Sequence, residues 1–256
     1  MNLPSISGDG FIRDGIWTEL GLGPNALQFL ERVYSAGLDK YEGRLRTLGI
    51  PGGMRALDAG CGVGQWSFSM ASMCQEVYGV DVSFERMQAC RKLSIGWGIR
   101  NAHFVHSALE RLPFASASFD RTVCYSVLYQ TYYERSLQEL ARVTQKGGLL
   151  YISTNDIGRF IQQIVDRPNR APDFDPRAYG LATLRNTFLG RRHGLSPRTG
   201  GVVTRKARLL RLLGENGFQV IECAPEGRLM RGTEPFLSGS YLGLISTFDI
   251  LARKSV

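Results

Sequence analysis

Ala-Leu-Asp-Ala-Gly-Cys-Gly-Val-Gly occupies residues 56–64. An apolar run that ends in an acidic residue is typical of a buried strand, and three glycines follow it at positions 60, 62 and 64. Because glycine has no Cβ and adopts positive φ at little cost, such a turn lets the backbone approach a ligand closely. The stretch predicts a strand followed by a loop that binds a nucleotide cofactor.

A second apolar run ends in another acidic residue. Glu-Val-Tyr-Gly-Val-Asp-Val at 76–82 places Asp81 about 20 residues after the glycines, where Rossmann-like units carry the carboxylate that binds ribose hydroxyls. A dinucleotide fingerprint also needs a glycine at the third position of Gly-x-Gly-x-x-Gly to seat a pyrophosphate. Gln65 stands at that position. The spacing therefore disfavours a pyrophosphate-containing cofactor.

The alternation of apolar runs and helical patterns predicts the fold class. Six candidate strands alternate with helical patterns and a seventh follows without a long helix: Arg55–Ala59, Glu76–Val80, Ala102–His106, Arg121–Ser126, Leu149–Thr154, Phe218–Cys223 and Tyr241–Ala252. This order predicts an α/β fold with a Rossmann-like, doubly wound, mostly parallel seven-stranded sheet and helices on both faces. The loops at 59–64, 81–83, 107–109 and 126–130 would gather at the carboxyl ends of the strands, where such sheets bind ligands.

Two regions do not follow this alternation of strands and helices. Residues 1–50 are expected to form an N-terminal helical lid or lead-in, because apolar residues recur at helical spacing from Pro24 to Leu48. Residues 51–256 form the main predicted domain. Within it, 155–203 is too long for a plain connection. We expect a cap there, with helices at 160–165 and 179–189, before a helix at 204–216.

Residues 54–153 resemble the class I S-adenosylmethionine-dependent methyltransferases, specifically their UbiE/Coq5-like small-molecule branch. The first motif, Asp-x-Gly-x-Gly-x-Gly, begins at Asp58. Asp81 matches the ribose acid, and 108–114 followed by 118–120 looks like the second motif. Residues 137–152 look like the helix, glycine turn and fifth strand of the family.

The resemblance implies S-adenosylmethionine as cofactor, S-adenosylhomocysteine as product, and no metal. Ser107 stands where many relatives carry an Asp that accepts the adenine amino group, and its hydroxyl can hydrogen-bond without a charge. Tyr129 and Gln130 stand near a position where many relatives have a His. The expected cofactor-binding residues are Asp58, Gly60, Cys61, Gly62, Gly64, Asp81, Val82, Met87, Ser107, Ala108, Leu109 and Tyr125.

Composition excludes several classes of protein. The chain has 256 residues, of which 43% are hydrophobic and 21% charged, so it is neither disordered nor fibrous. No apolar run approaches the roughly 18 residues of a membrane span, and the first residues lack the features of a signal peptide. We expect a cytoplasmic protein. The five cysteines form no Cys-x-x-Cys pair, which favours buried structural thiols over a zinc site or disulfides.

The positive charge is local. The net charge is +8, and residues 176–214 carry nine Arg or Lys and no Asp or Glu. Arginine suits the bidentate capture of carboxylate or phosphate, so this segment could concentrate an anionic acceptor near the cap. The alternative is a solvated helix face, which fits Arg205, Arg208 and Arg211. The stronger substrate candidates are Arg185, Arg191, Arg192 and Arg198.

Other candidates concern the acceptor. His193 is the candidate general base if the acceptor is an alcohol or phenol, and a solvent-exposed loop histidine is the alternative. Tyr129 is a second catalytic candidate, and Tyr129 and Tyr133 are expected to line the acceptor pocket, with core packing as the alternative. Trp17 is either a lid over the methionine end of the cofactor or a structural tryptophan.

Three function classes remain open. The favoured one is methyl transfer to oxygen or nitrogen of a small, anionic metabolite or biosynthetic intermediate. A nucleic-acid methyltransferase is suggested by the basic segment and a pI near 9.4. It is disfavoured because strand four is followed by no Asp/Asn-Pro-Pro-aromatic sequence and no Pro-Cys motif occurs. The third class is a noncatalytic cofactor-binding protein. The oligomeric state and the acceptor are left open.

Overall fold

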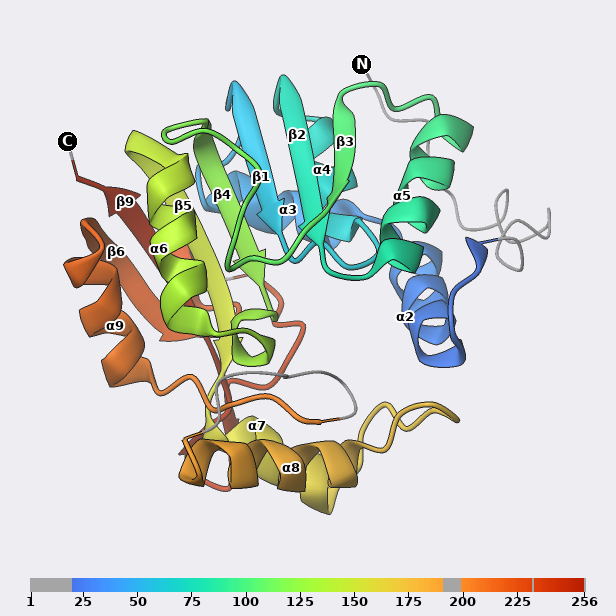
Figure 1. Ribbon diagram of the computed structural model, residues 1–256, viewed down its shortest axis with the longest axis vertical. Helices are drawn as coiled ribbons and strands as arrows, with labels where there is room; N and C mark the ends of the chain where they lie inside the picture. Colours follow the sequence, from blue (N-terminus) through green and yellow to red (C-terminus); the bar gives the residue numbers. More distant parts are fainter. Residues whose placement is uncertain (1–19, 191–198, 232, 256) are drawn as a thin grey trace.

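The computed structural model describes residues 20–190, 199–231 and 233–255. Seven strands form one sheet with the order β3-β2-β1-β4-β5-β9-β6 (Figure 1). Strands β1 to β5 pair in parallel, whereas β9 runs antiparallel to both β5 and β6. This confirms the predicted mostly parallel seven-stranded sheet. The strands are β1 Arg55–Ala59, β2 Glu76–Asp81, β3 Ala102–His106, β4 Phe119–Tyr125, β5 Thr144–Asn155, β6 Phe218–Pro225 and β9 Thr247–Lys254.

Helices cover both faces of this sheet, as predicted (Figure 1). A large apolar cluster on one face includes Trp66 and Phe68, and a second on the other face includes Leu137 and Leu209. None of the helices within the described ranges is long and apolar enough to cross a membrane. The helices beside the sheet are α2 Pro24–Ser35, α3 Asp39–Thr47, α4 Gln65–Ala71, α5 Phe84–Gly96, α6 Tyr133–Val143 and α9 Lys206–Glu215.

The N-terminal helices pack into the larger apolar cluster. Helix α2 begins at Pro24, whose fixed φ and missing N–H suit the first turn of a helix. Its residues Leu30, Val33 and Tyr34 are buried. The Tyr34 hydroxyl donates a 2.7 Å hydrogen bond to the carbonyl of Val63. Helix α2 therefore packs against the loop that follows β1 and supports it through this hydrogen bond.

Two further helices, α7 Ile157–Val165 and α8 Pro176–Phe188, lie across the carboxyl ends of the strands (Figure 1). We call the segment 155–203 that contains them the cap. The helices approach closely, since a Cβ on Gly180 would lie 2.8 Å from the Phe160 carbonyl oxygen. A small apolar cluster of Phe160, Tyr179 and Val203 holds them together. The cap thus has a separate, smaller core than the sheet.

The prediction of a single strand at Tyr241–Ala252 was wrong. Strands β7 Ser240–Tyr241 and β8 Leu244–Ile245 form a two-stranded hairpin, and β9 begins only at Thr247. Leu242 and Gly243 connect them with φ of 49° and 77°. Two consecutive positive φ values are typical of the tight turn that reverses a hairpin. The hairpin packs against α7 of the cap.

Candidate functional site

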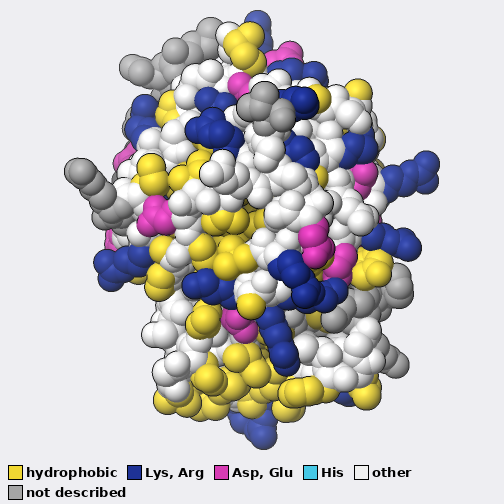
Figure 2. Space-filling model, turned by 90° about the vertical axis from the view of Figure 1, so that its left-hand side faces the viewer, with side chains coloured by type: hydrophobic (Ala, Val, Ile, Leu, Met, Phe, Trp, Pro, Cys, Tyr) yellow, Lys and Arg dark blue, Asp and Glu magenta, His cyan; other side chains and the backbone are white. Residues whose placement is uncertain are grey.

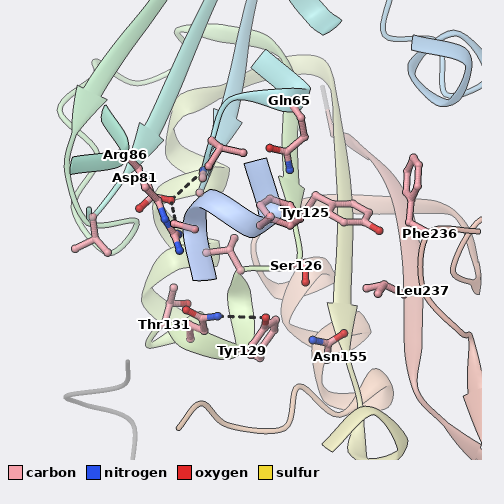
Figure 3. Close-up of a pocket in the computed structure, with 18 of the residues that line it drawn as sticks. Gln65, Asp81, Arg86, Tyr125, Ser126, Tyr129, Thr131, Asn155, Phe236 and Leu237 are labelled. Atoms are coloured by element: carbon pink, nitrogen blue, oxygen red, sulfur yellow. Dashed lines mark hydrogen bonds and ion pairs between the residues drawn. The ribbon is translucent and has the colours of Figure 1, made fainter. Parts of the chain in front are cut away.

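A cavity of about 1070 Å³ lies between the carboxyl ends of the strands and the cap. All four loops that the sequence predicted to gather there contribute to its wall: 59–64, 81–83, 107–109 and 126–130. Helix α2, the cap and residues 234–237 also contribute, together with residues of α3, α4, α5 and α6. Figure 3 shows side chains from these elements facing one space. The cavity is therefore assembled from segments far apart in the sequence.

The glycine loop, Gly60–Gly64, needs its three glycines for different reasons. All three have positive φ: 80° at Gly60, 57° at Gly62 and 87° at Gly64. A Cβ on Gly60 would lie 2.6 Å from Val127 Cγ2, and one on Gly64 would lie 2.8 Å from Phe68 Cε2. Gly62 has no heavy atom within 4 Å of its Cβ position and lines the cavity. The loop thus presents bare backbone to the cavity.

Asp81 links this loop to the end of β2. Its Oδ2 accepts a 3.0 Å hydrogen bond from the Gly62 amide (Figure 3). Its Oδ1 accepts a 2.9 Å bond from the Ser83 amide. Arg86 Nη1 lies 3.9 Å from Oδ2. A carboxylate can accept about four hydrogen bonds, so Asp81, which lines the cavity, retains acceptor positions for two hydroxyl groups of a ligand.

Asp58 lies behind the loop instead of in the cavity wall. It is 1% exposed, and the Ser67 hydroxyl donates a 2.6 Å hydrogen bond to its Oδ2. Burial raises the pKa of Asp58 to about 7. Cys61 and Met87 are also buried, with their sulfurs 4.0 Å apart. These buried residues support the glycine loop from the side away from the cavity.

The expected cofactor-binding residues therefore fall into two groups. Those that line the cavity are Gly60, Gly62, Asp81, Val82, Ser107, Ala108, Leu109 and Tyr125. Those absent from its described lining are Asp58, Cys61, Gly64 and Met87. Ser107 donates its hydroxyl proton to the Arg111 carbonyl at 2.9 Å, so the hydroxyl faces a ligand as an acceptor.

The wall formed after β4 carries polar and aromatic side chains (Figure 3). The Tyr125 hydroxyl donates to Glu226 Oε1 at 3.0 Å, and burial raises the pKa of Tyr125 well above its usual value. Ser126 has a φ of 57°, a conformation that costs a non-glycine residue about 1–3 kcal/mol and is found at functional sites. The Tyr129 hydroxyl accepts from Gln130 Nε2 at 3.2 Å. The strain at Ser126 has no signal in the sequence.

The remaining sequence candidates are placed elsewhere. The ring of Tyr133 is 2% exposed and absent from the described cavity lining, and its hydroxyl accepts a 3.0 Å bond from Arg208 Nε. This geometry supports the alternative prediction, in which Tyr133 packs in the core and does not contact the substrate. Arg185 is exposed and also absent from that lining. Trp17, Arg191, Arg192, His193 and Arg198 lie outside the described residues.

No local sequence pattern indicated that residues 234–237 line the cavity, where Phe236 lies beside Tyr125. Phe236 stacks on Tyr41 with ring centroids 4.8 Å apart, and the Arg44 guanidinium lies 4.1 Å above its ring. Arg44 is 2% exposed, pairs with Glu226, and donates to the Glu234 carbonyl at 2.7 Å. This buried arginine anchors the segment. Because its partners lie about 180 residues away, no local pattern could have predicted it.

The cavity has more basic than acidic groups among its described residues. Asp81 binds the glycine loop, and the Glu110 carboxylate accepts a 2.7 Å bond from the Tyr132 amide. The third acid of the lining is Glu234. The basic lining residues are Arg32, Lys40, Arg86, Arg135 and Arg159. The described residues place no group of three or more His, Cys, Asp or Glu side chains that could hold a metal ion.

Comparisons with known proteins agree with this architecture. The family model described as "Methyltransferase domain" matches residues 57–152. A demethylmenaquinone methyltransferase from Geobacillus kaustophilus is 31% identical over 109 residues, which cover 41% of this chain and 47% of the relative. The chain thus spans about half the length of the curated relatives it matches.

Solved structures share the fold at low sequence identity. The magnesium protoporphyrin IX methyltransferase of Synechocystis, with bound S-adenosylhomocysteine, aligns with a TM-score of 0.55 and 19% identity over 98% of this chain and 96% of that one. The [4+2]-cyclase SpnF aligns with a TM-score of 0.58 and 18% identity, covering 86% of this chain and 81% of that one. Residues 57–152 of this protein thus match the methyltransferase-domain family model and are similar to the UbiE-like, S-adenosylmethionine-dependent methyltransferases.

Proposed function

We propose that this protein transfers a methyl group from S-adenosylmethionine to an oxygen or nitrogen atom of a small-molecule acceptor. The observation that carries the proposal is the single cavity. At one end it holds the glycine loop and Asp81, and at the other it holds polar and aromatic side chains beneath the cap. Cofactor and acceptor would therefore meet inside one enclosed space.

The residues at the loop end fit this cofactor. The bare backbone at Gly62 admits a ligand where a side chain would occupy the open space, and the missing Cβ of Gly60 lets the loop pack against Val127. The free acceptor positions of Asp81 suit the two ribose hydroxyls. Ser107, Ala108 and Leu109 form the wall that would contact the adenine. When bound, the cofactor supplies an electrophilic methyl group on a sulfonium sulfur.

The task of the protein is then alignment and exclusion of water, which can contribute several kcal/mol to a bimolecular displacement. Tyr125 and Phe236 enclose the middle of the cavity (Figure 3). The Tyr129 hydroxyl accepts from Gln130, so its own proton is available to orient an acceptor atom. An amine or carboxylate acceptor needs no base. For an alcohol or phenol, His193 stays the candidate base, as a prediction.

The size of the cavity favours a small acceptor over a nucleic acid. Ligand pockets are typically about 300–1,000 Å³, and 1070 Å³ leaves room for a cofactor and a compact partner. Basic side chains are scattered over the face seen in Figure 2 and interspersed with acidic ones. A nucleic-acid site would instead need a continuous basic stripe.

Calorimetric titration with S-adenosylmethionine and S-adenosylhomocysteine tests the cofactor site. We expect Asp81→Ala to weaken both ligands by about 100-fold, because charge-assisted hydrogen bonds contribute about 1.5–3 kcal/mol each. Glu85→Ala is the matched control, since Glu85 lies on the same turn and is exposed. Equal affinities for wild type and Asp81→Ala would contradict the assignment of Asp81.

Methyl transfer is tested separately, with a labelled cofactor offered to panels of small acceptors and to RNA. Transfer to a small acceptor supports the proposal. Labelling of RNA would favour the nucleic-acid alternative. Tight cofactor binding without transfer to any acceptor would favour a noncatalytic role, or chemistry of another kind on the same fold.

A further inference from the structure

Arg159 is a cation of the cavity wall that forms no ion pair within the described part of the chain. It lies on α7 of the cap, is half-buried and lines the cavity. Its guanidinium donates a 2.9 Å hydrogen bond to Gln162 Oε1. No ion pair between the described residues includes it. Burial lowers the pKa of Arg159, and the positive charge of Arg32 acts in the same direction. Arg32 also lines the cavity, so this part of the wall carries two guanidinium groups.

Gln163 lies one helical turn beyond Arg159. Residues four apart share one face of a helix, and both side chains line the cavity. Gln163 is 8% exposed, and its Oε1 has no hydrogen-bond partner among the described residues. A buried amide without a partner costs about 1–3 kcal/mol. The pair is thus arranged for a polar group that enters from the cavity.

The chemistry of such a group follows from the residues. A guanidinium taken partly out of water is stabilised by an anion, and its planar fork matches the two oxygens of a carboxylate or phosphate. The Gln163 Oε1 beside it is an acceptor, so it suits a hydroxyl or N–H donor that the same ligand carries next to its anionic group.

We propose that Arg159 binds a carboxylate or phosphate group of the methyl acceptor, which is therefore an anion, and that the Gln163 Oε1 accepts a hydrogen bond from a hydroxyl or amine of the same molecule. The proposal rests on the proposed function and deepens it. It moves the anion-binding role from Arg185, which is exposed outside the described lining, to a cation that faces the cavity.

The test uses the full chain saturated with S-adenosylhomocysteine and three probes of similar shape. Benzoate presents a carboxylate, phenyl phosphate presents a phosphate, and benzamide is the neutral isostere. Affinities are measured by calorimetry for wild type, Arg159→Gln and Arg159→Lys. Arg185→Gln is the control, because it removes an exposed cation from the same cap.

We expect at least one anion to bind the wild type at least 10-fold more tightly than benzamide, and the tighter anion identifies the group. Arg159→Gln should remove this preference, Arg159→Lys should keep part of it, and Arg185→Gln should leave it unchanged. An equal affinity for benzamide, no measurable binding of either anion, or an unchanged preference in Arg159→Gln would each overturn the proposal.

Two controls keep the outcomes separate. If S-adenosylhomocysteine itself does not bind, the proposed function fails, whereas cofactor binding without an anion preference defeats only the role of Arg159. Thermal unfolding of each variant establishes that it is folded. If Arg159→Gln does not fold, Arg159→Lys decides the question, because a single ammonium loses the bidentate geometry but keeps the charge.

Discussion

The two ends of the cavity are built in different ways. At the cofactor end, the glycine loop presents backbone, and its supports Asp58, Cys61 and Met87 are buried beside the sheet. At the cap end, the wall consists of side chains on helices that share only a small apolar cluster. The cofactor end is therefore part of the main hydrophobic core. The cap end is a separate layer of helices that packs on this core.

The cap end and the cofactor end also differ at the molecular surface. Hydrophobic side chains gather at the cap end of the molecule (Figure 2). Exposed residues there include Phe188 and Leu189 at the end of α8 and Leu244 and Ile245 in the β7–β8 hairpin.

Exposed hydrogen bonds tie the cap to α2: the Asn25 amide donates to Asp173 Oδ1 at 2.9 Å, and Arg32 donates to Asn169 Oδ1 at 2.7 Å. Under the proposed function, cofactor binding would depend on the core and acceptor choice on the cap.

The largest expected effect concerns the buried arginine that anchors the wall near the cofactor end. Arg44→Met should lower the free energy of unfolding by about 3–5 kcal/mol, because it leaves the Glu226 carboxylate buried without its cation. Urea unfolding measures this loss. The double variant Arg44→Met/Glu226→Gln should recover part of it, and no recovery would argue against an ionic cause.

The next-largest effect should distinguish Gly60 from Gly62, two glycines of the glycine loop. Gly60→Ala should lower the free energy of unfolding by about 2–3 kcal/mol, because its Cβ would collide with Val127 and its φ is positive. Gly62→Ala should cost only about 1 kcal/mol, since nothing surrounds its Cβ, yet it should weaken S-adenosylhomocysteine binding by at least 10-fold. Thermal unfolding and calorimetry measure the two quantities. Equal losses of stability would contradict the packing argument.

A pH dependence should arise from the core. Burial raises the pKa of Asp58 to about 7 and that of Asp249 to about 6. Between the unfolded pKa near 4 and these values, the folded state binds more protons than the unfolded state. Stability should therefore fall as the pH rises from 5 to 7, by about 3–4 kcal/mol, and then level off. Urea titrations at several pH values measure the slope, and Asp58→Asn should flatten it.

The smallest effect is expected in the contacts between α2 and the cap. Asp173→Ala removes an exposed hydrogen bond, so it should lower the free energy of unfolding by at most about 1 kcal/mol. Because this contact borders the cavity, the variant should release S-adenosylhomocysteine faster in stopped-flow measurements. A loss as large as that of Arg44→Met would show that the cap shares the main core after all.

The sequence by itself determined the cofactor end. Strands β1 and β3 have the predicted bounds, and the glycine loop and Asp81 lie where their spacing indicated. The physical reason is that these features depend on short-range properties: apolar runs, the conformational freedom of glycine, and a fixed rise per residue in a strand. The cap helices were also visible as local patterns, because helical periodicity needs no distant partner.

Only the tertiary structure decided which side chains meet in the cavity. The Arg44 network joins residues whose partners are far away in the chain, and the cavity brings the segment at 234–237 and the side chains of Arg159 and Gln163 together with the distant glycine loop. The charge count drew attention to 176–214, but Arg208 pairs with Glu134 at 2.9 Å and is exposed. Composition records how many cations a segment holds. Packing determines which cation faces the cavity without an acid beside it.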